Sequence, residues 1–149
     1  MTVTTTRVTG PQVPARAAAE RPPAAAPTSR AALGLLRQAA DGLAEAYRED
    51  DPLLRYPAAY LAALRGAAAV LAVHARPSPR RGSARNVWAL LAEVAPELSE
   101  WTLFFASCSA TRSAAEAGIA RLVGRREADD LLRAAEQFLG LVRAAVPVR

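Results

Sequence analysis

Apolar residues recur at helical intervals in four stretches of the chain, separated by short polar or proline-containing segments. The first stretch follows Thr28 or Ser29, either of which can cap a helix N-terminus. This pattern predicts a helix that ends at the acidic turn Glu49–Asp51, with an apolar stripe of Leu33, Leu36, Ala40, Leu43 and Tyr47.

The second stretch predicts a helix from Pro57 to about His74, with Leu61, Leu64, Ala68 and Leu71 on one face. Alanine and glycine fill most of its other positions, which suits a helix contacted from more than one side. Arg65 interrupts the apolar sequence, and it either reaches solvent along its aliphatic stem or pairs with an acid from another helix.

The third stretch, Ser83–Gly118, holds both tryptophans and two of the three phenylalanines, so part of the core must form here. Ser83 can cap the helix, and Pro96 is expected to bend or split it because proline lacks the backbone N–H. The apolar positions at helical spacing are Trp88, Leu91, Pro96, Leu98, Trp101, Phe105 and Cys108.

The fourth stretch begins after a connection at residues 119–126, and acids occupy its first turn, where they favour the helix dipole. Its stripe is Ala128, Leu131, Ala135, Phe138 and Val142, widened by Leu132 and Leu139. Four such helices with short connections predict an all-α fold, an up-down antiparallel four-helix bundle over residues 29–149. Residues 1–28 mix Thr, Pro, Ala and Arg without a period, so we expect a disordered tail there.

Composition adds little about function. All 19 basic residues are arginines, which together with the alanine content indicates GC-rich coding and a bacterial source rather than selection for phosphate binding. Cys108 is the single cysteine and is expected to be a buried, inert thiol, so no internal disulfide forms and a cytoplasmic location is favoured.

The stretch 58–75 resembles a membrane span, but Arg65 near its middle would cost roughly 2.5–3.5 kcal/mol there. We therefore expect a soluble bundle helix and no membrane contact.

The expected topology separates the charges. It places the acidic turn Glu49–Asp51 at the same end as Arg121, Arg125 and Arg126, which would neutralise that turn. The opposite end receives an acid-free arginine loop and the N-termini of two helices, so we expect this end to attract anions. Its arginines are Arg76, Arg80, Arg81 and Arg85, joined by Arg30, Arg143 and Arg149.

Motifs for catalysis are absent from the sequence. It contains no Gly-rich phosphate loop, no metal-ligand cluster and no nucleophile with a nearby histidine, so we expect no enzyme activity, no cofactor and no metal. His74, the only histidine, falls at a helix end, where a capping or surface role is favoured over a catalytic one.

Three phrases resemble small HEPN-type helical domains of high-GC bacteria: YPAAYLAALRGAAAVLA (56–72), VWALLAEVAPELSEW (87–101) and EADDLLRAAEQFL (127–139). The resemblance implies a four-helix bundle, often dimeric, in a superfamily of RNases, toxin components and non-catalytic nucleotide or nucleic-acid binders. Catalytic members carry an arginine, four to six residues and then a histidine in a late helix. Here His74 follows Arg65 after eight residues in an early helix, so RNase activity is not carried over.

Two functions follow from the sequence. The first is binding of nucleic acid, nucleotide or another polyanion through Arg76, Arg80, Arg81 and Arg85. His74, Arg143 and Trp88 would be accessory, with Trp88 either a stacking surface or a core residue. The alternative is a dimerisation or protein-partner module in which the arginine loop is merely solvated. A third alternative is an atypical RNase that uses His74 with an arginine.

Overall fold

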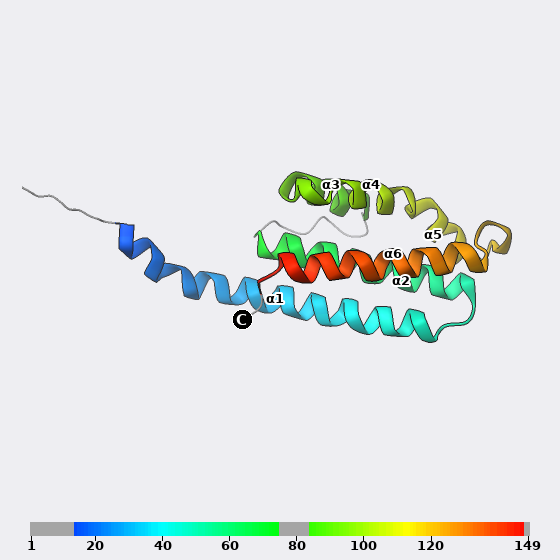
Figure 1. The fold of residues 1–149 in the computed structure, drawn as a ribbon, viewed down its shortest axis with the longest axis horizontal. Helices are drawn as coiled ribbons and strands as arrows, with labels where there is room; N and C mark the ends of the chain where they lie inside the picture. The colour runs from blue at the N-terminus through cyan, green and yellow to red at the C-terminus, as the bar shows by residue number, and fades with distance from the viewer. Residues whose placement is uncertain (1–13, 75–83, 148–149) are drawn as a thin grey trace, which may run out of the picture.

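The chain folds into helices throughout the residues that the computed structural model describes, which are 14–74 and 84–147, with side chains described at 30–74 and 87–147. Over these residues there is no strand, so the predicted all-α class is confirmed (Figure 1). The elements are α1 (Pro14–Arg48), α2 (Pro52–Val73), α3 (Ala84–Val94), the 3-10 helix η2 (Pro96–Leu98), α4 (Ser99–Ser107), α5 (Ser109–Glu116), the 3-10 helix η3 (Ala120–Leu122) and α6 (Arg125–Ala145).

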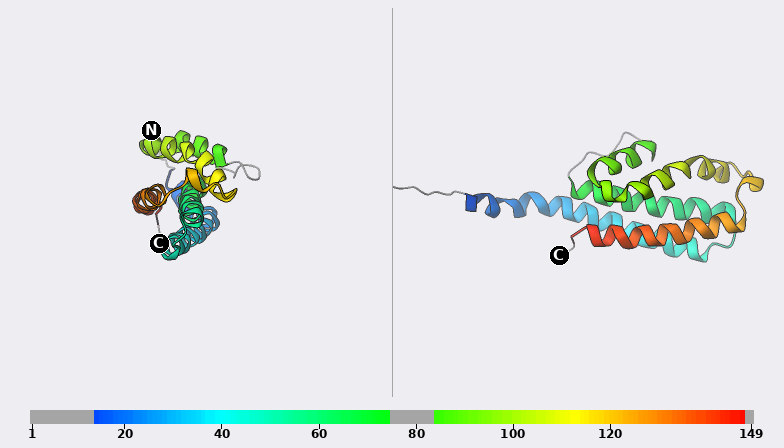
Figure 2. Two further views of the ribbon diagram at one scale, coloured as in Figure 1. Left: turned by 90° about the vertical axis from the view of Figure 1, so that its right-hand side faces the viewer. Right: turned by 45° about the horizontal axis from the view of Figure 1, so that its top comes forward.

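Helix α2 is the centre of the domain. It packs against α1, α6, α5 and α3, which agrees with the prediction of a helix contacted from several sides. Figures 1 and 2 show α1 and α6 running alongside α2, while α3, α4 and α5 form a segmented layer on another side. Because neighbours pack against α2 on several sides, most of its buried residues are small.

Helix α2 starts five residues earlier than expected. The Asp51 carboxylate accepts a hydrogen bond from the Leu53 N–H at 3.0 Å, and Pro52 occupies the first helical position, where its missing N–H costs nothing. Pro57, the predicted start, lies inside the helix. The prediction was wrong because the Asp51–Pro52 pair is the stronger start signal.

The buried faces of α1 and α2 also differ from the predicted leucine stripes. In α1, Ala40 and Tyr47 are exposed, and in α2 Leu61 is exposed, whereas alanines fill the contact between the helices. A Cβ atom at Gly42 would lie 3.6 Å from the Ala62 Cβ atom, so the two helices approach closely. Buried alanines occur on both helices, at Ala32, Ala39 and Ala46 of α1 and at Ala59, Ala62 and Ala63 of α2.

The third stretch is split at Pro96, as predicted, and it breaks again at Cys108. Helix α3 ends at Val94, and η2 carries Pro96 in its first turn, where no N–H is needed. The last segment ends at Glu116, two residues before the predicted end. Gly118 then adopts a positive φ of 79°, which glycine accommodates without strain.

An aromatic cluster joins this layer to α2 and α6. The Trp88 ring stacks on Phe105 with a centroid distance of 5.2 Å, and both rings contact Phe138 of α6. The Trp88 indole Nε1–H donates a hydrogen bond of 2.9 Å to the Tyr60 hydroxyl, so its polar atom is satisfied inside the core. The predicted α6 stripe is confirmed, since Ala128, Leu131, Leu132, Ala135, Phe138, Leu139 and Val142 are all buried.

Helix α1 begins at Pro14, whereas a disordered tail was expected through residue 28. Figure 1 shows its N-terminal part projecting beyond the other helices. Residues 14–28 include seven alanines and continue a helix whose remainder packs on α2, and alanine has the highest helix propensity. The rest of the predicted tail, residues 1–13, lies outside the described residues.

Candidate interaction surfaces

The predicted anion-binding loop lies almost wholly outside the described residues. Arg76, Arg80 and Arg81 fall in the undescribed range 75–83, and Arg85 is described only as backbone in the first turn of α3. Arg30 and Arg143, predicted at the same end, are both exposed. These two side chains are the part of the predicted basic end that the structure describes.

His74 caps the C-terminus of α2. Its backbone N–H donates to the Val70 and Leu71 carbonyl oxygens, and its ring Nδ1 lies 2.9 Å from the Val70 carbonyl oxygen. This geometry is the capping role that was favoured from the sequence. Trp88 is 2% exposed in the aromatic cluster, so the core alternative holds and its ring faces are not open to a stacked base.

Arg55 joins the C-terminal end of α1 to α6, and this role was not predicted from the sequence. Its Nε–H donates to the Ala46 carbonyl at 3.0 Å and its Nη2–H to the Tyr47 carbonyl at 3.1 Å, so it satisfies the last carbonyls of α1. Its Nη1–H also donates to the Asp129 carboxylate at 2.5 Å, which ties α6 to the same point.

The predicted neutralisation of Glu49–Asp51 by Arg121, Arg125 and Arg126 is therefore replaced by different contacts. Asp51 is used as the N-cap of α2, and no ion pair within the described ranges joins the acidic turn to those three arginines. A signal was present in the sequence, because Arg55 lies one helical turn beyond Asp51 and so faces the end of the preceding helix.

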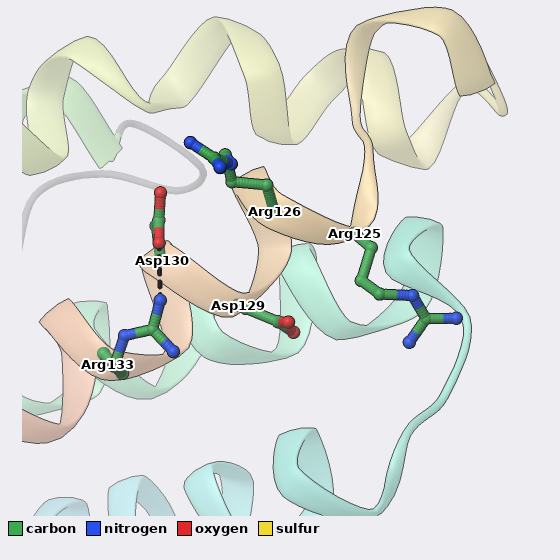
Figure 3. Close-up of a pocket in the computed structure, with 5 residues that line it drawn as sticks. All are labelled: Arg125, Arg126, Asp129, Asp130 and Arg133. Atoms are coloured by element: carbon green, nitrogen blue, oxygen red, sulfur yellow. Dashed lines mark hydrogen bonds and ion pairs between the residues drawn. The ribbon is translucent and has the colours of Figure 1, made fainter.

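A hollow of about 640 Å³ at the start of α6 is lined by three arginines and two aspartates (Figure 3). Figure 3 shows Arg125 and Arg126 pointing in different directions, while Arg133 and Asp130 pair at 2.6 Å. Asp129 is held by Arg55. The charges are mixed and the two remaining arginines diverge, so the hollow does not converge on a single anion.

One face of α2 is left uncovered by its neighbours. Leu54 is 55% exposed and Leu61 is 38% exposed, and the half-buried Ala58, Arg65, Ala68 and Ala72 continue the same line along the helix. These positions follow one another at intervals of four and three residues, which is the spacing of a straight seam between two packed helices. We call the six residues from Leu54 to Ala72 the α2 stripe.

The packing of α2 explains why this stripe is open. Ala62 faces Gly42 of α1, Gly66 faces α6, and Tyr60 contacts Trp88 of α3 and the Arg112 guanidinium of α5. Each of these residues points to a side away from the stripe. Leu61 and Ala68 were predicted on the apolar face of this helix, whereas Leu54 was missed because the predicted helix started at Pro57.

A small polar cluster is buried between α2 and α5. Burial raises the pKa of Cys108, although its hydrogen bond with Tyr56 acts in the opposite direction. The pKa of Tyr56 is raised mainly by burial and further by Cys108. Cys108 is thus a buried thiol, as expected, and it is protonated at neutral pH.

Neither a metal site nor a lipid-facing helix follows from the described residues. Among them, no three His, Cys, Asp or Glu side chains gather to hold a metal ion. Helix α2 has the length and composition of a membrane span, but 56% of its most apolar window is buried inside the domain, as in a core helix.

Comparison with known proteins gives one match. The family model for SAV_6107-like HEPN domains matches residues 46–143, which include the end of α1, the whole of α2 to α5 and nearly all of α6. Neither the curated proteins nor the solved structures gave a match. The family match covers well over half of the chain and agrees with the phrases that resembled HEPN-type domains. The chain therefore belongs to the SAV_6107-like HEPN family.

Proposed function

We propose that this HEPN domain is a helical interaction module that forms a homodimer through the α2 stripe. The observation that carries the proposal is the exposure of Leu54 and Leu61 on the central helix, beside small residues on the same line. Large apolar side chains on an otherwise packed helix favour a helical partner.

The order of residues along the stripe favours a second copy of the chain. Its N-terminal half carries the large side chains Leu54 and Leu61, and its C-terminal half carries the small Ala68 and Ala72. An antiparallel pairing centred near residue 63 brings Leu54 against Ala72 of the partner subunit and Ala58 against Ala68 of the partner subunit. Leu54 then fills the space beside a small residue, and the two alanines of the second pair let the helices approach closely.

The same pairing accommodates the single charge of the stripe. It sets Arg65 against Leu61 of the partner subunit, so the aliphatic stem of the arginine covers the leucine while the guanidinium reaches the rim. The two Arg65 side chains do not face each other, because each meets a leucine. The pairing therefore requires no buried like-charge contact.

Analytical ultracentrifugation of the purified protein tests this proposal. We expect a dimer in the micromolar range and a monomer for Leu61→Asp, because a carboxylate on the seam would be desolvated without a partner. Leu141→Asp is the matched control, since Leu141 is also exposed, at 44%, but lies on α6. A monomeric wild type, or a Leu61→Asp protein that remains dimeric, would show that the α2 stripe is not the interface.

A second candidate function is the binding of a polyanion at the basic end without catalysis. It is supported by the exposure of Arg30 and Arg143 and by the position of Arg85 in the first turn of α3, next to the acid-free arginine loop. Phosphates would meet both arginines and the N-terminus of the α3 helix, whose dipole favours anions.

Fluorescence anisotropy with labelled single-stranded RNA and duplex DNA, titrated at two salt concentrations, tests the second candidate. Four phosphate contacts on duplex DNA predict a log–log salt slope of about −3.6, since each contributes about −0.9. Arg80→Ala/Arg81→Ala should weaken binding, whereas Arg121→Ala/Arg125→Ala at the other end should not. Absence of saturable binding at low salt rejects this function.

A further inference from the structure

The outer face of α4 is apolar and acidic, unlike the rest of this arginine-rich chain. Leu103 is 73% exposed and Phe104 is 41% exposed, the former being the most exposed large apolar side chain within the described residues. They lie three and four residues after Glu100, so the three side chains share one face of the helix. The opposite face of α4 is buried through Thr102 and Phe105.

The charges in the segment that carries this face have one sign. From residue 86 to 111 the chain contains three glutamates and no basic residue, although its net charge is +5. Glu97 and Glu100 are exposed and take part in none of the ion pairs between described side chains. The carboxylates of Glu97 and Glu100 therefore lie near the apolar pair along the chain and are not paired with any described basic side chain.

Two of the three hydroxyl groups of α4 are not available to a ligand at this surface. The Ser107 hydroxyl donates a hydrogen bond of 2.6 Å to the Phe104 carbonyl, and the Thr102 hydroxyl donates one of 2.8 Å to the Ser99 carbonyl. Both groups are satisfied by the helix backbone. Polar recognition at this face is thus left to the exposed Ser99 hydroxyl and to the carboxylates of Glu97 and Glu100.

Phe104, the aromatic member of the apolar pair, is held in place by the core beneath it. The Phe104 ring meets Phe105 edge to face at a centroid distance of 5.0 Å, and Phe105 stacks on the Trp88 ring. A preorganised aromatic anchor loses little side-chain entropy on binding. Its arrangement on one helix face is that of a surface that packs along a second helix.

We propose that the outer face of α4 is a docking site for a basic amphipathic helix of a partner protein, with Leu103 and Phe104 in its apolar stripe and Glu97 and Glu100 paired to its cations. Charge complementarity selects this partner, because an acidic or neutral helix would leave the glutamates unpaired at the rim. The site is separate from the α2 stripe, so it does not depend on dimer formation.

Two synthetic 18-residue peptides test the site. Both carry leucines at helical intervals of three and four, and one has lysines at the flanking positions where the other has glutamates. Trp101 is half-buried on α4 and contacts Phe105, so tryptophan fluorescence reports binding next to the apolar pair. We expect saturable binding of the lysine peptide, at least ten times tighter than that of the glutamate peptide.

Three variants locate the binding. Leu103→Ser/Phe104→Ser should lower the affinity for the lysine peptide at least tenfold. Glu97→Lys/Glu100→Lys should make the protein bind the glutamate peptide more tightly than the lysine peptide. Leu122→Ser, which changes an exposed leucine of η3, is the matched control and should leave both affinities unchanged. Circular dichroism checks that each variant keeps its helices.

Several results would overturn the proposal. Equal affinity for the two peptides would remove the role of the glutamates, and unchanged affinity of Leu103→Ser/Phe104→Ser would place binding elsewhere. If that variant instead converts a peptide-free dimer to a monomer in ultracentrifugation, a second copy of the chain covers this face and the partner helix is rejected.

Discussion

Gly66 of α2 lies directly against Leu139 of α6, and a Cβ atom at Gly66 would overlap the Leu139 Cδ2 atom. Val142 and Phe138 flank the same point, so a displaced leucine has little room to move. The absence of a side chain at this position therefore sets how closely the central helix and α6 approach.

Gly66→Ala should destabilise the domain by about 1–3 kcal/mol, because overpacking costs more than the gain in helix propensity returns. Gly140→Ala is the matched control on the facing helix, where no atom lies within 4 Å of the added Cβ. It should stabilise by about 0.5–1 kcal/mol through propensity alone. Urea unfolding measures both, and equal stability of the two variants would contradict the close approach.

Arg55→Ala should lower the free energy of unfolding by about 1–3 kcal/mol, because it leaves two carbonyls of α1 and the Asp129 carboxylate without their donor. Arg133→Ala is the control. It breaks an ion pair of similar length with Asp130 in which both side chains are more than half exposed, so it should cost at most about 0.5 kcal/mol. If Arg55→Ala lowers the free energy of unfolding no more than Arg133→Ala does, the contacts of Arg55 add nothing to stability.

Asp51→Ala should cost about 0.5–2 kcal/mol, since it removes the side-chain acceptor that caps α2 at Leu53. The neighbouring Asp50 is exposed and accepts no hydrogen bond from the described residues, so Asp50→Ala is a control of equal charge. Thermal unfolding of both variants compares the cap with charge removal. If the two changes shift the midpoint equally, charge rather than capping explains the effect.

Alkaline pH should destabilise the domain. Burial raises the pKa of Cys108 above its ordinary 9.0 and that of Tyr56 above its ordinary 10.0, so the folded state retains protons that the unfolded state has lost. Stability from these groups is complete below about pH 9 and falls as pH rises beyond each unfolded value. Urea midpoints measured from pH 8 to 11 should decline, and less so in Tyr56→Phe. A flat profile in the wild type would contradict the raised pKa values.

Sequence reasoning succeeded where apolar residues are large and periodic. The α6 stripe was predicted in full, because leucine and phenylalanine at helical spacing leave one face to bury. It succeeded only in part on α1 and α2, where Leu36 and Leu71 are buried as predicted but Ala40, Tyr47 and Leu61 are exposed and other alanines are buried instead. Hydrophobicity ranks leucine above alanine, but close approach selects the smaller side chain.

The candidate surfaces were harder to predict than the fold, and for a related reason. Leu61 was predicted on the apolar face of the second helix together with Leu71, which is buried. Only the packing around Gly42, Gly66 and Tyr60 shows that the side of α2 with Leu61 stays open. Arg55 was missed because its partners come from α1 and α6, far apart in the sequence. The anion-binding loop remains a prediction.

The breaks at Pro96 and Cys108 divide the third stretch into α-helices of 11, 9 and 8 residues. An isolated helix shorter than roughly 12–15 residues is only marginally stable in water, and all three are shorter than this. These pieces are stable only while they rest on α2 and α6, which span 22 and 21 residues. Local unfolding of the domain should therefore begin in this layer, and its amide protons should exchange with solvent ahead of those in α2. The α4 face belongs to this layer, so a bound helix would slow exchange there while the centre of the domain stays unchanged.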